Sequence, residues 1–275
     1  MNAAPHLITR HLGALELLTA EYGAARVVFS TRAGGVSRGP YAQLNLGLSV
    51  GDDPAVVLHN RGLLCEALAL GLDELVIPGQ VHGTRVAVIG ERERGRGARS
   101  RDDVIHDTDG LVTAVPRVAL VTSFADCVPV FVVGETATGA LVIALAHAGW
   151  RGMLAGVVGT LVQTVATLGV PRAALVGPSI GPCCFAAADD VADQFAQHFG
   201  AEVVLRESDE AAVDLWRCAA IDLERRGVAP AAIVNPRLCT SCDARFFSHR
   251  RDRGLTGRQV AIAWLADGDS EGSGT

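Results

Sequence analysis

Runs of apolar residues constrain the fold of this chain more than any other feature of its sequence. Val118 to Ser123, Val128 to Val133 and Ala140 to Ala146 are largely apolar and lack the polar alternation of a half-exposed strand. Strands of this kind are buried on both faces, as in sheets that helices cover. The sequence therefore predicts the α/β class, with sheets buried beneath helices.

Further segments with strand-like or helical periodicity are mixed along the whole chain. The other strand-like segments are Arg26 to Thr31, Arg85 to Ile89, Ala173 to Val176, Ala231 to Val234 and Gln259 to Trp264. The helical ones are Pro54 to Leu70, Gly152 to Leu168, Ala188 to Phe199 and Glu210 to Arg226. Because no linker or internal repeat divides them, we expect one domain over residues 1–265. The polar, glycine-rich residues 266–275 are expected to form a disordered tail.

Charge and cysteine content exclude several classes of partner and compartment. The formal net charge is −6, and the arginine-rich segment Glu91 to Asp103 is diluted by acids and glycines, so we expect no nucleic acid partner. The uncharged segment Met153 to Val170 contains several Gly, Thr and Gln residues, which favours a buried helix over a membrane span. Seven cysteines without a visible secretory signal indicate a reducing, cytoplasmic compartment.

All 24 basic residues of the chain are arginines, and lysine does not occur. Schiff-base chemistry and a P-loop, both of which need lysine, are therefore excluded. Any anionic substrate must be bound by arginines or by backbone N–H groups.

Two histidines and one cysteine stand where strands or loops end. These are His82 in "QVHGTRV", Cys127 in "SFADCVPV" and His147 in "ALAHAGWRG". Two imidazoles and a thiolate make a valid zinc site with one position open for water. Small residues after each histidine would let a metal or ligand approach. Two hydrogen-bonded histidines and a buried thiol would give the same spacing.

Two arginines are candidates for binding an anion. Arg151 precedes a helix predicted to begin at Gly152, and helix N-termini favour anions. Arg32 and the glycines of "FSTRAGGVS" could cradle a phosphate or a ribose, although a plain glycine turn would have the same sequence.

Two further motifs are assigned structural roles. "GPSIG" matches the GxSxG pattern of serine hydrolases, but Pro182 and two cysteines follow where a helix should begin, so a turn is expected. Cys239 and Cys242 form a CxxC whose only candidate partners are the adjacent Cys183 and Cys184. Because adjacent cysteines make a poor zinc knuckle, we interpret these as packing or incidental thiols.

Several motifs together resemble one known family. "FSTRAGGVS", "LNLGLSVGDDP", "HNR", "QVHGTRV", "DGLVT", "ADCVPV", "AHAGWRG", "GPSIGPCCF" and "FFSHRRD" are similar, in content and order, to motifs of the YfiH (DUF152) family. Its members carry the names polyphenol oxidase (laccase domain), purine nucleoside phosphorylase and peptidoglycan editing factor. The resemblance runs from about Val27 to about Leu265. It departs at His59 and His249, where a glutamate and an aromatic residue are usual.

The resemblance implies a single α/β domain of layered mixed sheets flanked by helices, with zinc held by His82, Cys127 and His147. It implies phosphorolysis of adenosine, inosine and methylthioadenosine, and deamination of adenosine. The small-molecule partners would be a nucleoside and phosphate. Copper is an alternative metal, since Cu(II) displaces zinc at His/Cys sites. On this hypothesis Arg32, Arg61 and Arg151 bind phosphate, and Asn45 binds the ribose or base.

Three other functions remain open at this point. The first is a laccase-like copper polyphenol oxidase, although a laccase needs several coppers. The second is a metal-free hydrolase that uses the Cys127 thiolate with His82 or His147, for instance on peptidoglycan precursors. The third is a non-catalytic, zinc-stabilised binding protein. The sequence does not distinguish a monomer from a homodimer.

Overall fold

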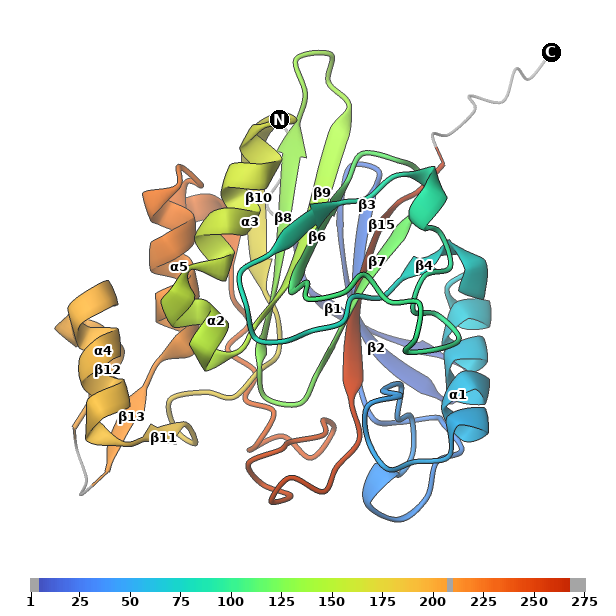
Figure 1. The fold of residues 1–275 in the computed structure, drawn as a ribbon, viewed down its shortest axis with the longest axis horizontal. Helices are drawn as coiled ribbons and strands as arrows, with labels where there is room; N and C mark the ends of the chain where they lie inside the picture. Colours follow the sequence, from blue (N-terminus) through green and yellow to red (C-terminus); the bar gives the residue numbers. More distant parts are fainter. Residues whose placement is uncertain (1–4, 207–209, 268–275) are drawn as a thin grey trace.

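Two six-stranded sheets, packed face to face, form the centre of the protein in a computed structural model that describes residues 5–206 and 210–267 (Figure 1). The first sheet contains, in spatial order, β1 (Ile8–Leu12), β2 (Leu15–Tyr22), β3 (Ala25–Ser30), β15 (Gln259–Leu265), β7 (Ala119–Phe124) and β4 (Leu75–Val76). The second contains β14 (Ile233–Val234), β10 (Val170–Val176), β8 (Val128–Glu135), β9 (Leu141–Ala148), β6 (Gly110–Thr113) and β5 (Val86–Val88). Both sheets mix parallel and antiparallel pairs.

Helices cover the outer face of each sheet, which gives four layers. On the first sheet lies α1 (Pro54–Ala67), whose Leu64 and Cys65 pack against that sheet. On the second lie α2 (Trp150–Ala155), α3 (Val157–Ala166) and α5 (Leu215–Arg225). At the edge of the molecule, α4 (Asp189–Phe199) packs beside a small sheet of β11 (Ala186–Ala187), β13 (Ala211–Val213) and β12 (Val204–Leu205) (Figure 1). The predicted class of layered sheets flanked by helices is confirmed.

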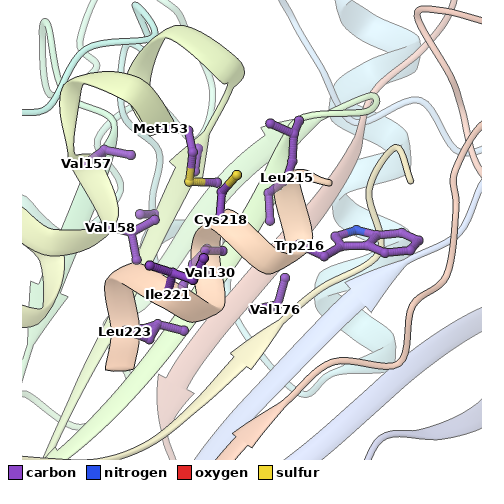
Figure 2. Close-up of a cluster of buried hydrophobic side chains, with 14 of the residues drawn as sticks. Val130, Met153, Val157, Val158, Val176, Leu215, Trp216, Cys218, Ile221 and Leu223 are labelled. Atoms are coloured by element: carbon purple, nitrogen blue, oxygen red, sulfur yellow. The ribbon is translucent and has the colours of Figure 1, made fainter. Parts of the chain in front are cut away.

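The central strands are apolar on both faces because each face meets a different layer. In β8, Val130 and Val132 point to the helices, whereas Phe131 and Val133 pack between the two sheets. Figure 2 shows the helix side, where Val130 and Val176 lie among side chains of α2, α3 and α5. This double burial accounts for the unbroken apolar runs of the sequence.

The predicted elements are found, with differences at several ends. The helix predicted over Gly152 to Leu168 begins at Trp150 and is divided at Gly156, whose φ of +90° interrupts the helical backbone. The helix predicted from Glu210 begins only at Leu215, because residues 211–213 pair as β13. Seven strands within the described residues have no counterpart among the predicted ones, namely β1, β2, β4, β6, β11, β12 and β13. The predicted tail lies outside the described residues from 268 onward.

None of the described helices combines the length and the apolar character needed to cross a membrane.

Two glycines offer a test of the backbone description. A methyl group at either Gly62 or Gly156 would meet no atom within 4 Å, but only Gly156 has a positive φ. Gly62→Ala, within α1, should therefore stabilise the fold by roughly 0.5–1 kcal/mol. Gly156→Ala should destabilise it by about 1–2 kcal/mol. Urea unfolding of both variants measures the two changes, and shifts of the same sign would contradict the break between α2 and α3.

Candidate metal centre

His82, Cys127 and His147 come together at one end of the sandwich. His82 lies on the segment that crosses from β4 of the first sheet to β5 of the second. Cys127 lies on the crossing from β7 to β8, and His147 is near the end of β9. The pairing of β8 with β9 places Pro129 opposite His147, so Cys127 and His147 end up side by side.

The spacing of the three side chains suits one metal ion. The Cys127 Sγ and His82 Nε2 atoms are 3.7 Å apart, and the ligand atoms of all three residues lie within 4.8 Å of one another. Sulfur and nitrogen ligands of a tetrahedral zinc ion lie about 3.6 Å apart. The two imidazole rings are 4.8 Å apart between centroids and inclined by 72°, so they do not stack. The three residues therefore fit a zinc ion.

The buried carboxylate of Asp109 orients both histidines. It accepts a hydrogen bond from His147 Nδ1 at 3.0 Å. It also accepts the backbone N–H groups of Val81, His82 and Gly83 at 3.1, 3.0 and 2.8 Å. With Nδ1 engaged, His147 presents Nε2 to the metal position, an arrangement common around zinc-bound histidines.

Sheet register places Asp109 beside His147. Gly110 pairs with Ala146, so the residue before β6 meets the residue after Ala146, and the His147 N–H donates to the Asp109 carbonyl at 2.7 Å. Burial by itself raises the pKa of Asp109, but the hydrogen bonds from His147 and the loop amides outweigh it and hold that pKa below its usual value. Asp109 is therefore an anion, which would balance part of the charge of a cation held by the two histidines and Cys127.

The loop that carries His82 needs this support. His82 has a φ of +59°, in the left-handed region that residues other than glycine rarely adopt. Its own N–H and the N–H groups on either side all point to Asp109. These three bonds offset the cost of the unusual backbone and fix the ring next to Cys127.

Glycine at position 149 keeps the centre accessible. A methyl group there would clash with the His82 ring and lie 3.2 Å from Cys127 Sγ. One turn later, a methyl group on Gly152 would lie 3.0 Å from the Gly83 carbonyl oxygen. The small residues of "HAGWRG" thus let the start of α2 pack directly on the His82 loop.

Cys127 and His147 shift each other's pKa. Burial alone raises the pKa of Cys127, but the neighbouring His147 and His82 rings outweigh burial and lower it to about 6. For His147, burial alone lowers the pKa, whereas Cys127 and Asp109 together raise it to about 9. Cys127 is therefore a thiolate near neutral pH, the form that binds a metal or acts as a nucleophile.

A cleft of about 730 Å³ opens beside the three residues, which form part of its wall. Its size is within the range of small-molecule sites. The arginines that line it are Arg61, Arg101, Arg151, Arg250 and Arg258.

Two of the predicted substrate-binding residues line this cleft. Arg151, exposed on the first turn of α2, lies over the Trp150 ring at 4.2 Å. Arg61 is buried and donates to the carbonyl oxygens of Leu46, Gly97 and Ala98. Burial lowers the pKa of Arg61 to about 10, so it remains a cation at neutral pH.

The other two predicted residues, Arg32 and Asn45, are engaged in loop contacts and are not among the described residues that line the cleft. Arg32 donates to the Ala42 carbonyl at 2.7 Å and lies over the Phe247 ring. Asn45 is fully buried, and its side chain accepts the N–H of Arg258 at 2.8 Å. Their roles in substrate binding stay predictions, whereas their loop contacts are part of the structure.

Two residues that the sequence reasoning missed are prominent here. Asp109 precedes β6 in the "DGLVT" segment, and a carboxylate directly before a buried strand was the available signal. Arg258 similarly precedes β15 and lines the cleft, and its backbone is held by Asn45.

Comparison with known proteins identifies the family. A family model described as "Multi-copper polyphenol oxidoreductase laccase" matches residues 26–266. The chain belongs to this family. The purine nucleoside phosphorylase YlmD of Geobacillus stearothermophilus is 40% identical over 244 residues, which cover 85% of this chain and 87% of the relative. The adenosine deaminase RL5, from an unknown prokaryotic organism, is 37% identical over 232 residues, covering 81% and 87%.

Solved structures of family members have the same fold. That of YlmD from Geobacillus stearothermophilus has a TM-score of 0.86 and 35% identity, covering 94% of this chain and 98% of the other. That of a hypothetical protein YfiH from Bacillus licheniformis also has a TM-score of 0.86, with 31% identity and the same coverage. The predicted resemblance to the YfiH family is confirmed.

Asp109→Asn tests how this family member organises its centre. The amide has one NH₂ group where the carboxylate accepts N–H donors, so at least one of the four bonds must be lost. Metal affinity should fall on the order of 10–100-fold. Competition with a chromophoric chelator measures it, with the exposed Asp190→Asn on α4 as the matched control. Unchanged affinity in Asp109→Asn would refute the orienting role.

Proposed function

We propose that the protein is a zinc-dependent purine nucleoside enzyme, which cleaves adenosine, inosine or methylthioadenosine with phosphate and also deaminates adenosine. One observation carries the proposal: a three-residue His/Cys group lies in the wall of an arginine-lined cleft of about 730 Å³. The names of its relatives, purine nucleoside phosphorylase and adenosine deaminase, support the same substrate class.

The ligand set favours zinc. Two imidazole nitrogens and one thiolate suit this borderline-soft cation and leave a fourth position free. Zinc, when bound there, supplies a Lewis acid that lowers the pKa of a coordinated water toward neutrality. His147 and His82 are held for this role by Asp109, and Cys127 supplies a negative charge that strengthens cation binding.

The arginines of the cleft support phosphate as a co-substrate. Arg151 presents an exposed guanidinium, and Arg258 presents a partly buried one. Burial lowers the pKa of Arg258, while the nearby Cys127 and Asp126 raise it in part. A cation in this setting gains from an anionic partner, and guanidinium groups bind phosphate through paired N–H donors.

In phosphorolysis, a phosphate oxygen forms a bond to C1′ of the ribose while the bond from C1′ to the purine nitrogen breaks. The ribose carries positive charge in the transition state, so a phosphate held beside it is stabilising. In deamination, water adds at C6 of adenine and ammonia leaves. No histidine of the chain is followed by x-Glu, so the general acid and base differ from those of the zinc nucleobase deaminases.

Incubation of the zinc-loaded protein with adenosine, with and without phosphate, tests the proposal by chromatography of the products. Adenine that forms only with phosphate is the result expected for phosphorolysis, and inosine that forms in both samples is expected for deamination. Cys127→Ala should abolish metal binding at this centre and both activities. Cys218→Ala, which removes a buried thiol outside the cleft, is the matched control. Adenosine, inosine and methylthioadenosine that all stay intact, or full activity in Cys127→Ala, would overturn the proposal.

Arg151→Gln tests the phosphate site. Loss of one charge-assisted contact, about 1.5–3 kcal/mol, should raise the KM for phosphate on the order of tenfold or more. The rate of deamination should stay nearly constant, because that reaction does not use phosphate. The exposed Arg172→Gln on β10 serves as the control. An unchanged KM for phosphate in Arg151→Gln would exclude Arg151 from the phosphate site.

A second candidate function rests on the lowered pKa of Cys127. A thiolate beside two imidazoles is also the arrangement of a cysteine hydrolase, for which a peptidoglycan precursor is a candidate substrate. Inactivation by iodoacetamide together with full activity in the presence of a chelator would favour this function. The zinc proposal expects the chelator to inactivate the enzyme.

The family name favours a third candidate, a copper-dependent phenol oxidase. Within the described residues, one histidine-containing group can hold a metal, whereas laccase chemistry uses several coppers. Two results together would favour the oxidase. The copper-loaded protein would oxidise phenols and lose this activity in Cys127→Ala, and the zinc-loaded protein would not turn over nucleosides.

A further inference from the structure

Four cysteines that the sequence analysis treated as incidental thiols come together in the structure. Cys183 and Cys184 follow β10, and Cys239 and Cys242 follow β14. Their four sulfur atoms all lie within 4.8 Å of one another. This cluster is separate from the metal centre, since none of the four residues lines the cleft.

The sulfur spacing is that of thiolates around one metal ion. Cys242 Sγ lies 3.3 Å from Cys184 Sγ and 3.6 Å from Cys183 Sγ. Two sulfurs bound to one tetrahedral zinc ion lie about 3.8 Å apart, whereas a disulfide bond is about 2.05 Å long. All four cysteines are free thiols in the structure.

The surrounding backbone supplies a hydrogen-bond donor to the sulfur of Cys239. The Gly181 N–H donates to Cys239 Sγ at 3.3 Å. Backbone amides that point at sulfur stabilise negative charge in the same way as amides around other anions.

The two cysteine-bearing loops already pair through their backbones. The Ser179 N–H donates to the Leu238 carbonyl at 3.1 Å, and the Thr240 N–H donates to the Ser179 carbonyl at 3.0 Å. Ser179 is buried, and its hydroxyl accepts from Trp216 Nε1 at 2.7 Å. "GPSIG" was expected to form a turn, but Ser179 forms an isolated parallel bridge with Cys239, and the turn lies at residues 182–184. The pairing brings Cys239 against the segment that leads into Cys183 and Cys184.

We propose that Cys183, Cys184, Cys239 and Cys242 bind a structural zinc ion through four thiolates. Four sulfur ligands close the tetrahedron, so this ion has no open position for a substrate. Binding releases the four thiol protons and requires no oxidant or reductant. Cys183 and Cys242 are exposed, which gives the ion a path from solvent. The adjacent cysteines Cys183 and Cys184 can both be ligands because the other two ligands come from a separate loop. Backbone hydrogen bonds hold that loop against the first one.

The proposed ion would stabilise one wall of the substrate cleft. Ile180 and Phe185, on either side of the adjacent cysteines, line that cleft. Arg250, also in its wall, donates from its guanidinium to the carbonyl oxygens of Cys184 and Ala186 at 3.1 and 3.0 Å. The carboxylate of Asp126, the residue before Cys127, accepts from the Thr240 hydroxyl at 2.7 Å. A metal that joins the two loops therefore fixes both the wall and the start of the Cys127 segment.

Zinc content and zinc X-ray absorption test the proposal independently of enzyme activity. The wild-type protein, purified with zinc and reductant, should contain two zinc ions per chain. Cys127→Ala and Cys242→Ser should each contain one, and the double variant none. Cys65→Ala, which alters a buried thiol of the α1 layer, should keep two. The single zinc of Cys127→Ala should show four sulfur neighbours at about 2.3 Å.

Other outcomes would overturn the proposal. The same zinc content in Cys242→Ser and wild type would show that the cluster binds no zinc, and so would nitrogen or oxygen neighbours around the zinc of Cys127→Ala. If the wild-type protein has a mass lower by two hydrogens, with a cysteine of the cluster in a disulfide under reducing conditions, the cluster forms a disulfide bond and not a metal site. Iron in place of zinc would refute the choice of metal. If Cys242→Ser fails to fold, the absorption measurement on Cys127→Ala still decides.

Discussion

The carboxylate of Asp109 is the contact on which the centre depends. It joins a strand residue, His147, to a loop that holds His82 in a left-handed backbone conformation. A buried carboxylate is stable only if its oxygens are satisfied, and here one imidazole and three amides satisfy them. The same bonds that make this burial possible set the tautomer of His147 and the position of His82. The hydrogen bonds that allow Asp109 to be buried therefore also set the geometry of the two histidines.

The architecture explains why the site lies at this end of the molecule. Two sheets packed face to face must be connected by segments that cross from one to the other, and the crossings β4 to β5 and β7 to β8 carry His82 and Cys127. Antiparallel pairing of β9 with β8 and β6 then adds His147 and Asp109. The doubly buried strands anchor the segments that carry the ligands. The arginines of the cleft come from helices α1 and α2 (Arg61 and Arg151) and from loops (Arg101, Arg250 and Arg258). Because the chain has no lysine, every basic side chain there other than histidine is a planar guanidinium, which suits paired contacts with phosphate.

The sequence predicted what depends on local pattern and missed what depends on distant contact. Unbroken apolar strands indicated layered sheets. His82, Cys127 and His147 were predicted as one group, chiefly from the family motifs, and their ligand atoms lie within 4.8 Å of one another. Asp109 was missed because its role appears only when β6 and β9 pair. The proximity of the four cysteines was missed for the same reason, since spacing along the chain does not show that two loops meet. Arg32 and Asn45 are the opposite case, since both were predicted to bind substrate. In the structure, their side chains make hydrogen bonds that stabilise the loops around them.

In the proposed centre, His82, Cys127 and His147 hold one metal ion, with His147 bound to the metal through Nε2 and to Asp109 through Nδ1. Anomalous diffraction above the zinc absorption edge, from crystals of the zinc-loaded protein, tests it most directly. We expect an anomalous peak about 2.0–2.1 Å from Nε2 of each histidine and about 2.3 Å from Cys127 Sγ. The hydrogen bond between Asp109 and His147 should persist in those crystals. A peak bonded to His147 Nδ1, or no peak among the three residues at full zinc loading, would contradict it.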